Sequence, residues 1–230
     1  MSNDEKKGLG YGIGQVTALT TEQMKQQSSF SGWDFANVWG FKPGVNGGYP
    51  VLRAFHDFPS SWAEEQVNQA IALNLVPLSL QNKYQQATTR AEFCALAVAL
   101  IEKLTGKEIT ERESFTDTSD INVQKIAGLG IVTGRGGGVF DPNGGISRQE
   151  AAVILEKAAR KGLGKELPAG EITFKDLGGS YAVDAIKKMR GVSPGIMSGK
   201  SADTFDPDGK FTREESISTM LKLWDWYGKP

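Results

Sequence analysis

Apolar residues recur with helical spacing in three stretches of this chain. A side chain that returns every three or four residues lies on one face of an α-helix, and that face packs against other elements. The apolar positions are Phe93, Leu96, Leu100 and Leu104 in the first stretch, Ala152, Leu155, Ala158 and Ala159 in the second, and Ile217, Met220, Leu221 and Trp224 in the third. The pattern predicts three long amphipathic helices.

The same start signal precedes each stretch. A hydroxyl residue is followed three residues later by glutamate, which is the capping box of a helix N-terminus. The pairs are Thr89 with Glu92, Ser147 with Glu150, and Thr212 with Glu215. A glycine follows each stretch, at Gly106, Gly162 and Gly228, and glycine is a common helix stop.

Arginine occupies the first helical position in all three stretches, as Arg90, Arg148 and Arg213. A cation there opposes the helix dipole at a cost of about 0.3–1 kcal/mol. Two explanations remain open at this point. Each arginine has a fixed carboxylate partner inside the fold, with Asp57, Asp117 and Asp176 as candidates, or it binds an anion from outside.

Shorter elements also recur upstream of each long helix. An aromatic residue and an aspartate come first, then a short amphipathic helix, and then a loop that leads into the long helix. The predicted short helices are residues 62–73, 121–129 and 181–189. One such pair of helices cannot bury its apolar face alone, so we expect the three units to pack together.

The first 54 residues differ from the rest of the chain in their pattern of aromatic residues and glycines. Aromatic residues are dense in 30–41, and a glycine-rich turn at 44–48 precedes the extended segment 49–53. Aromatic residues between such turns favour short β-strands. We therefore predict a small β-rich segment in front of the helical units.

The composition excludes several kinds of binding site and catalytic site. The 230 residues have a net charge of −1, which argues against nucleic-acid binding. The single Cys94 excludes an internal disulfide, and the single His56 leaves no histidine set for a metal site or a catalytic triad. Two stretches, 139–150 and 204–215, resemble calcium loops but lack the first carboxylate, so we expect no metal and no cofactor.

No apolar run is long enough to span a membrane, and the first residues lack the apolar core of a signal peptide. Because a recloned piece of a secreted protein would look the same, the start of the chain leaves a cytoplasmic and a secreted origin open.

Residues 55–228 resemble three tandem S-layer homology repeats. The resemblance rests on the order in which five features occur: an aromatic residue with Asp, an apolar helix, Gly-Ile, a glycine loop with Phe-Asp-Pro, and Ile-Ser-Arg-Gln-Glu or its equivalent. Residues 115–162 follow this order along their whole length. It implies a mainly α fold, a pseudo-threefold bundle of helix-loop-helix units at 55–108, 109–163 and 164–230. Residues 20–53 resemble the closing unit of β-strand repeat domains in secreted bacterial surface proteins.

Two units depart from the family pattern. The first has 76–84 in place of the glycine loop, with Tyr84 where a phenylalanine is expected. The third has Tyr181 where tryptophan is common, and an additional segment at 190–194. These departures predict unequal binding by the three units.

The resemblance implies a function at the cell surface. S-layer homology repeats hold secreted proteins non-covalently on Gram-positive-type cell walls by binding a secondary cell-wall polysaccharide, often with acidic pyruvyl groups, in grooves between repeats. We accordingly expect an extracellular, monomeric fragment of a larger secreted protein, with a wall polysaccharide as partner, no nucleic acid, no membrane insertion and no enzymatic activity. The alternative is a structural or protein-interaction module with internally paired arginines; a two-carboxylate glycosidase is a third hypothesis.

The predicted glycan-binding residues are Arg90, Arg148, Arg213, Trp62, Asp117, Gly136 and Gly137. A guanidinium group can donate two parallel hydrogen bonds to a carboxylate, which is the reason for choosing the arginines. Each choice has a structural alternative: an internal ion pair for the arginines, helix packing for Trp62, and turn geometry for the glycines.

Overall fold

The structure is a computed structural model that describes residues 18–228. The chain divides into two compact units between Phe58 and Pro59, and each is described by itself. Residues 1–17 of the predicted N-terminal segment lie outside the described residues. Within residues 18–228, no helix is both long enough and apolar enough to cross a bilayer.

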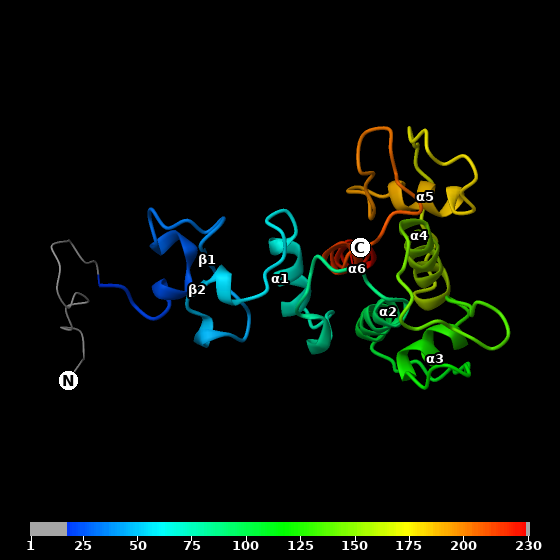
Figure 1. The fold of residues 1–230 in the computed structure, drawn as a ribbon, viewed down its shortest axis with the longest axis horizontal. Helices are drawn as coiled ribbons and strands as arrows, with labels where there is room; N and C mark the ends of the chain where they lie inside the picture. Colours follow the sequence, from blue (N-terminus) through cyan, green and yellow to red (C-terminus); the bar gives the residue numbers. More distant parts are fainter. Residues whose placement is uncertain (1–17, 229–230) are drawn as a thin grey trace. The chain divides into compact units, whose positions relative to one another are not determined.

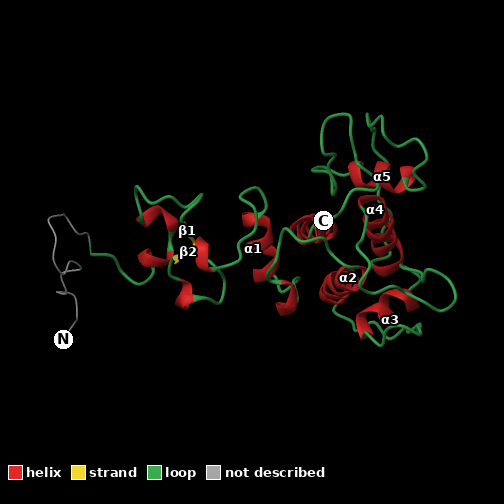
Figure 2. Cartoon of the chain, viewed as in Figure 1, coloured by secondary structure: helices red, strands yellow, loops and turns green. Residues whose placement is uncertain are grey.

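The first unit contains a small antiparallel sheet (Figure 2). Its strands are β1 (Trp39–Gly40) and β2 (Val51–Leu52), with Trp39 opposite Leu52. Four short 3₁₀ helices surround it, η1 (Gln23–Lys25), η2 (Gln27–Ser29), η3 (Asn46–Gly48) and η4 (Arg53–Phe55). The dense aromatic residues pack against one another: the rings of Phe35 and Phe41 stack with centroids 5.4 Å apart, and Phe35 is buried.

The second unit is helical and contains a long and a short helix for each predicted repeat (Figures 1 and 2). The short helices are α1 (Glu64–Ala72), α3 (Ile121–Gly128) and α5 (Val183–Arg190), and the long ones are α2 (Arg90–Thr105), α4 (Arg148–Lys157) and α6 (Arg213–Gly228). The loop after α1 contains one further 3₁₀ turn, η5 (Leu78–Leu80). The prediction of a mainly α fold with a small β segment is confirmed. We call α1 with α2 the first repeat, α3 with α4 the second, and α5 with α6 the third.

Each long helix is covered by the short helix of the next repeat. Helix α3 packs on α2, and α5 packs on α4. The third contact runs back to the start of the unit, because α1 packs on α6 (Figure 1). The repeats therefore close into a ring in which the last repeat meets the first.

Backbone hydrogen bonds follow the same cyclic order. The first N–H groups of a helix have no partner within the helix and need one elsewhere. The N–H of Arg90 donates to Gly144 O at 2.9 Å, and that of Arg148 donates to Gly209 O at 3.1 Å. The N–H of Arg213 donates to Gln86 O at 2.9 Å, so the loop of the first repeat completes the helix of the third.

The three predicted capping boxes are confirmed. Thr89 and Ser147 accept hydrogen bonds from the N–H groups of Glu92 and Glu150, and each glutamate accepts one from the N–H of its hydroxyl residue. Thr212 and Glu215 form the same reciprocal pair. The local sequence thus fixes the start of every long helix.

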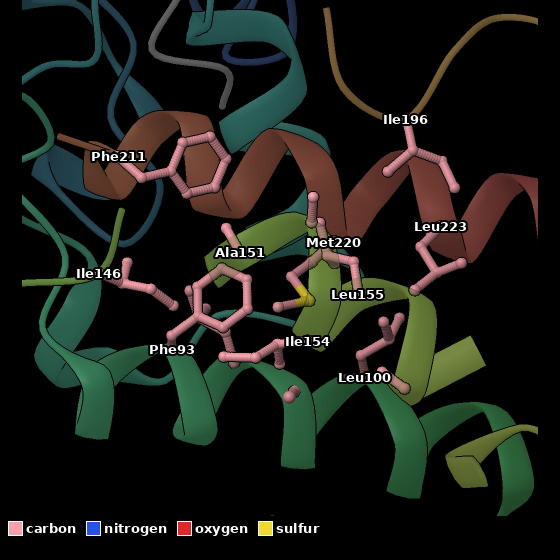
Figure 3. Close-up of a cluster of buried hydrophobic side chains, with 14 of the residues drawn as sticks. Phe93, Leu100, Ile146, Ala151, Ile154, Leu155, Ile196, Phe211, Met220 and Leu223 are labelled. Atoms are coloured by element: carbon pink, nitrogen blue, oxygen red, sulfur yellow. The ribbon is translucent and has the colours of Figure 1, made fainter. Parts of the chain in front are cut away.

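Apolar side chains from all three long helices meet in one core (Figure 3). Phe93 and Leu100 come from α2, Leu155 from α4, and Met220 and Leu223 from α6, and all are buried. Each loop adds a ring to this core. Tyr84 is buried in the first repeat, as Phe140 and Phe205 are in the other two, so its ring takes the place that the sequence suggested.

The second long helix ends with a wider turn than the others. After Lys157 the chain continues as the π-helix η6 (Ala158–Gly162), and the N–H of Leu163 donates to Ala158 O at 3.0 Å. Gly162, the predicted stop, is the last residue of this turn. A Cβ atom there would lie 2.5 Å from the Ile101 side chain, so glycine allows this turn to approach α2.

Gly128→Ala is expected to destabilise the fold. At the end of α3, an alanine Cβ would lie 2.5 Å from Arg112 N and 2.6 Å from the Glu111 carbonyl carbon, and backbone atoms cannot move aside cheaply. Overpacking of this kind costs about 1–3 kcal/mol of unfolding free energy. Urea unfolding checks this, with Gly145→Ala as control because its Cβ would meet nothing within 4 Å. Equal unfolding midpoints for the two variants would contradict the packing described here.

A cationic groove beside a closed ring of arginines

The three N1 arginines are almost completely buried. Arg90, Arg148 and Arg213 are 6%, 3% and 5% exposed. Arg90 donates from Nε to Phe140 O at 3.0 Å and from Nη2 to Thr133 O at 2.9 Å. Arg148 repeats the pattern with Phe205 O at 2.8 Å and Ser198 O at 2.6 Å.

Each arginine also meets a carboxylate of the next repeat. Arg90 Nη1 lies 3.7 Å from Glu150 Oε1, and Arg148 Nη1 lies 3.3 Å from Glu215 Oε1. The ring closes between the third repeat and the first, where Arg213 Nη2 lies 2.5 Å from Glu92 Oε1.

The three glutamates thus have two roles each. The Oε2 atom caps the helix of its own repeat, and the Oε1 atom binds the arginine of the preceding one. The internal partners are these capping glutamates, whereas the sequence had suggested aspartates.

Aromatic rings complete the environment of two arginines. The Arg90 guanidinium lies 4.4 Å from the Phe140 ring centroid, and that of Arg148 lies 4.8 Å from the Phe205 centroid. Burial is the main cause that lowers the pKa of Arg90 and of Arg148. Arginine nevertheless stays protonated in proteins, so the fold must supply counter-charge for these groups.

Asp117 fixes the loop of the second repeat. Its Oδ1 accepts a hydrogen bond from Phe140 N at 2.8 Å, and its Oδ2 accepts one from Asp141 N at 2.7 Å. Asp176 holds Phe205 and Asp206 in the same way. These bonds hold Asp141 and Asp206 at φ +62°, a left-handed conformation that is uncommon for residues other than glycine.

The other predicted site residues lie in exposed positions. Trp62 is 55% exposed and lies just before α1. Gly136 and Gly137 have φ values of +103° and +61° at an exposed loop tip, and a Cβ atom at either would meet nothing within 4 Å. Backbone conformation, rather than lack of space, therefore requires glycine at both positions.

A groove of about 290 Å³ lies beside Arg90. It runs between the loop of the second repeat and α4, and its lining residues are Arg90, Ile131, Val132, Thr133, Gly134, Arg135, Glu150, Val153, Ile154, Lys157 and Tyr181. Of the seven predicted site residues, this lining includes Arg90. It does not include Arg148, Arg213, Trp62, Asp117, Gly136 or Gly137.

The groove has three cations and one acid. Arg135 is 48% exposed and places Nη1 2.8 Å from Glu150 Oε1. The Lys157 side chain has no hydrogen bond or ion pair within residues 18–228, so its charge is available to a ligand. Tyr181 is 68% exposed, and partial desolvation together with the nearby Glu150 charge raises the pKa of Tyr181.

The sequence analysis missed Arg135, Lys157 and Tyr181, although a signal for Lys157 was present. Glu150, Val153, Ile154 and Lys157 follow the i, i+3, i+4, i+7 spacing of one helical face. The equivalent positions are Glu215, Ser218, Thr219 and Lys222 in α6, and Glu92, Ala95, Leu96 and Ala99 in α2. The face therefore presents a lysine in two repeats and alanine in the other.

The two calcium-like loops are held by other contacts. Gln149 Nε2 donates to Asp208 Oδ1, and Asp141 and Asp206 adopt the turn described above. In the described part of the chain, no three His, Cys, Asp or Glu side chains are grouped to hold a metal ion.

Residues 114–152 and 173–215 match the S-layer homology domain. This chain contains S-layer homology repeats. The matched segments fall in the second and third repeats. The first repeat lies outside them, and it is the one in which residues 76–84 replace the glycine loop.

Curated proteins with similar sequences come from bacterial cell surfaces. The chain is 28% identical over 155 residues to a surface-layer 125 kDa protein of Lysinibacillus sphaericus, which covers 66% of this chain and 12% of the relative. It is 38% identical over 103 residues to a cellulosome-anchoring protein of Acetivibrio thermocellus, which covers 43% of this chain and 22% of the relative. The chain thus spans a small part of the relatives it matches.

Arg213→Gln is expected to destabilise the ring at its closing contact. The change leaves Glu92 without its buried guanidinium partner, and breaking a buried pair costs about 3–5 kcal/mol of unfolding free energy. Urea unfolding measures the loss. Arg160→Gln is the control, because it breaks an exposed pair with Glu156 and should change stability little. Similar unfolding midpoints for both variants would show that the ring contact contributes no more than a surface pair.

Acid is expected to weaken this fold through its aspartates. The backbone N–H bonds from Phe140 and Phe205 are the main causes that lower the pKa of Asp117 and of Asp176. Each aspartate has a lower pKa in the folded protein than in the unfolded chain, where it is near 3.8. Its ionised form therefore stabilises the fold above pH 3.8, and this stability is lost as the pH falls through the folded pKa. Melting temperature should therefore fall steeply below about pH 4. The double variant Asp117→Asn, Asp176→Asn should melt lower at pH 7 and show a shallower fall; an unchanged slope would contradict this cause.

Proposed function

We propose that the helical unit binds an anionic cell-wall polysaccharide and thereby holds a larger protein on the bacterial surface without a covalent bond. The observation on which this rests is the groove beside Arg90, in which three cations face one carboxylate and Lys157 has no acidic partner among residues 18–228. The similarity to surface-layer and cellulosome-anchoring proteins supports the cell surface as its location and a binding role without catalysis.

An acidic sugar fits the chemistry of this groove. Arg135 offers a planar fork that suits a carboxylate, and Lys157 offers a point charge. Tyr181 provides an exposed aromatic ring for the apolar face of a sugar. The groove volume of about 290 Å³ lies just below the range of ligand pockets, about 300–1,000 Å³, and is compatible with one substituted sugar of a polymer. A pyruvyl group would supply the carboxylate.

The predicted site residues contribute to this proposal in different ways. Arg90 lies at the groove, while its guanidinium is bound to Thr133, Phe140 and Glu150. Asp117 fixes the end of the loop that begins with Arg135, and Gly136 and Gly137 form the tip of that loop. Their proposed role is to position Arg135, rather than to contact the glycan.

The third repeat provides a second candidate contact. Arg148, Lys200, Lys222 and Trp62 match Arg90, Arg135, Lys157 and Tyr181 in order along the repeats. The set that includes Arg213 has Ala99 and Ile121 at the corresponding positions and thus lacks the lysine. Two weak contacts along a repeating polymer would raise the overall affinity through effective concentration.

The internal pairing of all three arginines favours a second candidate function, a structural or protein-interaction module without a glycan ligand. The two candidates differ in what the exposed groove cations do. In the structural module they can be replaced without loss of wall binding, whereas in the glycan-binding module they cannot.

Lys157→Gln and Arg135→Gln should each weaken binding to purified cell walls while leaving the melting temperature nearly unchanged. A lost charge-assisted hydrogen bond is worth about 1.5–3 kcal/mol, or roughly a 10- to 100-fold weaker affinity. Co-sedimentation with walls measures this. Lys175→Gln is the control, because Lys175 is exposed and pairs with Asp203 away from the groove lining.

Chemical removal of pyruvyl groups from the walls should weaken wild-type binding as well. Full binding by both groove variants, or equal binding to walls stripped of polysaccharide, would support the structural module instead.

A further inference from the structure

Glu150 is the one acidic residue in the lining of the groove. Its Oε2 accepts a hydrogen bond from Ser147 N at 2.9 Å and is thus occupied by the helix cap. Its Oε1 lies 2.8 Å from Arg135 Nη1 and 3.7 Å from Arg90 Nη1. One carboxylate oxygen therefore holds two guanidinium groups of the groove.

The two guanidinium groups differ in freedom. Arg90 is also bound to two backbone carbonyl groups and is buried, so it cannot leave Glu150 without loss of structure. The side chain of Arg135 is half exposed, and within residues 18–228 its one polar partner is Glu150. Arg135 can therefore exchange Glu150 for another carboxylate at the surface of the groove.

We propose that Glu150 is a built-in competitor for the acidic group of the ligand. It holds Arg135 while the groove is empty, and an acidic sugar binds by taking Arg135 from it. This inference rests on the proposed function and adds a specificity-determining residue to that site. Like charges close together oppose binding, so Glu150 keeps the affinity for one acidic sugar low.

A low affinity at one sugar suits a repeating ligand. Contacts that are weak singly and are repeated along a polymer give strong overall binding, while short fragments with one acidic sugar leave quickly. Glu150 would thus favour the intact polysaccharide over free acidic sugars, which share its chemistry. The residue that would distinguish polymer from free sugar is thus the same glutamate that caps the helix.

A comparison with the other two capping glutamates distinguishes the capping role of Glu150 from its proposed role as a competitor. Glu215 lies 2.6 Å from Lys200 Nζ and 3.3 Å from Arg148, so it repeats the arrangement around Glu150. Glu92 binds Arg213, and in the described residues no ion pair joins it to a second cation. Glu92→Gln therefore removes a cap carboxylate and an arginine partner without freeing a groove cation, which makes it the matched control for Glu150→Gln.

The experiment measures binding of a pyruvylated wall-polysaccharide fragment by isothermal calorimetry at low and high salt. Glu150→Gln should bind about tenfold more tightly than wild type at low salt, with a steeper dependence on salt, because Arg135 becomes free. Glu92→Gln should bind like wild type, although both variants lose thermal stability. A tightened affinity confined to Glu150→Gln cannot come from capping.

A double-mutant cycle with Arg135→Gln tests whether Glu150 acts through Arg135. Replacing Glu150 should improve affinity much less when Arg135 is already glutamine. Equal gains in both backgrounds, an equal gain in Glu92→Gln, or no gain in Glu150→Gln while wild type binds would each overturn the competitor role. Absence of binding by wild type would instead overturn the proposed function, and this role with it.

Discussion

The buried arginine at the start of each long helix is the constraint on which the helical unit depends. A guanidinium group removed from water needs hydrogen-bond acceptors and a counter-charge, and an isolated one would be strongly destabilising. No repeat supplies these by itself. The loop carbonyls and the capping glutamate that bind Arg90 and Arg148 belong to the following repeat. Asn82 and Glu92, which bind the Nη atoms of Arg213, belong to the first repeat, and the buried Arg213 Nε has no acceptor among the described residues. The pairwise fit of the repeats is therefore electrostatic as well as apolar.

The three repeats share the residues that fix their geometry and differ in nearby surface residues, so one groove can differ in charge from its counterparts. The capping glutamate, the N1 arginine and the buried ring occur in every repeat and keep the geometry. The position two turns further along the long helix lies outside the buried core. Lysine at 157 and alanine at 99 therefore change the charge of the surface without changing the fold.

The sequence predicted the parts of the structure that depend on local signals. The capping boxes fixed the helix starts, and Tyr84 was recognised as a ring in place of phenylalanine. The sequence did not decide which groups pair with the arginines, because their partners lie 43 or more residues away in a cyclic arrangement that local patterns do not encode. The closing pair, Arg213 with Glu92, joins the two ends of the unit.

The groove was harder to predict for a related reason. Arg135, Lys157 and Tyr181 belong to three different elements, and only the ring brings them together. Lys157 could have been identified from its helical spacing to Glu150, but nothing local relates either residue to Tyr181. The π-turn at the end of α4 was also not foreseen, because the local sequence does not show that Gly162 lies close to Ile101 of α2.

Closure of the ring also limits the number of copies. In an open stack of repeats each new member adds one interface and leaves a free end for another. Here Glu92 already receives Arg213, and α1 already covers α6, so a fourth copy would find both docking faces occupied. A further repeat would therefore have to pack on a surface other than the ones these three repeats offer to one another.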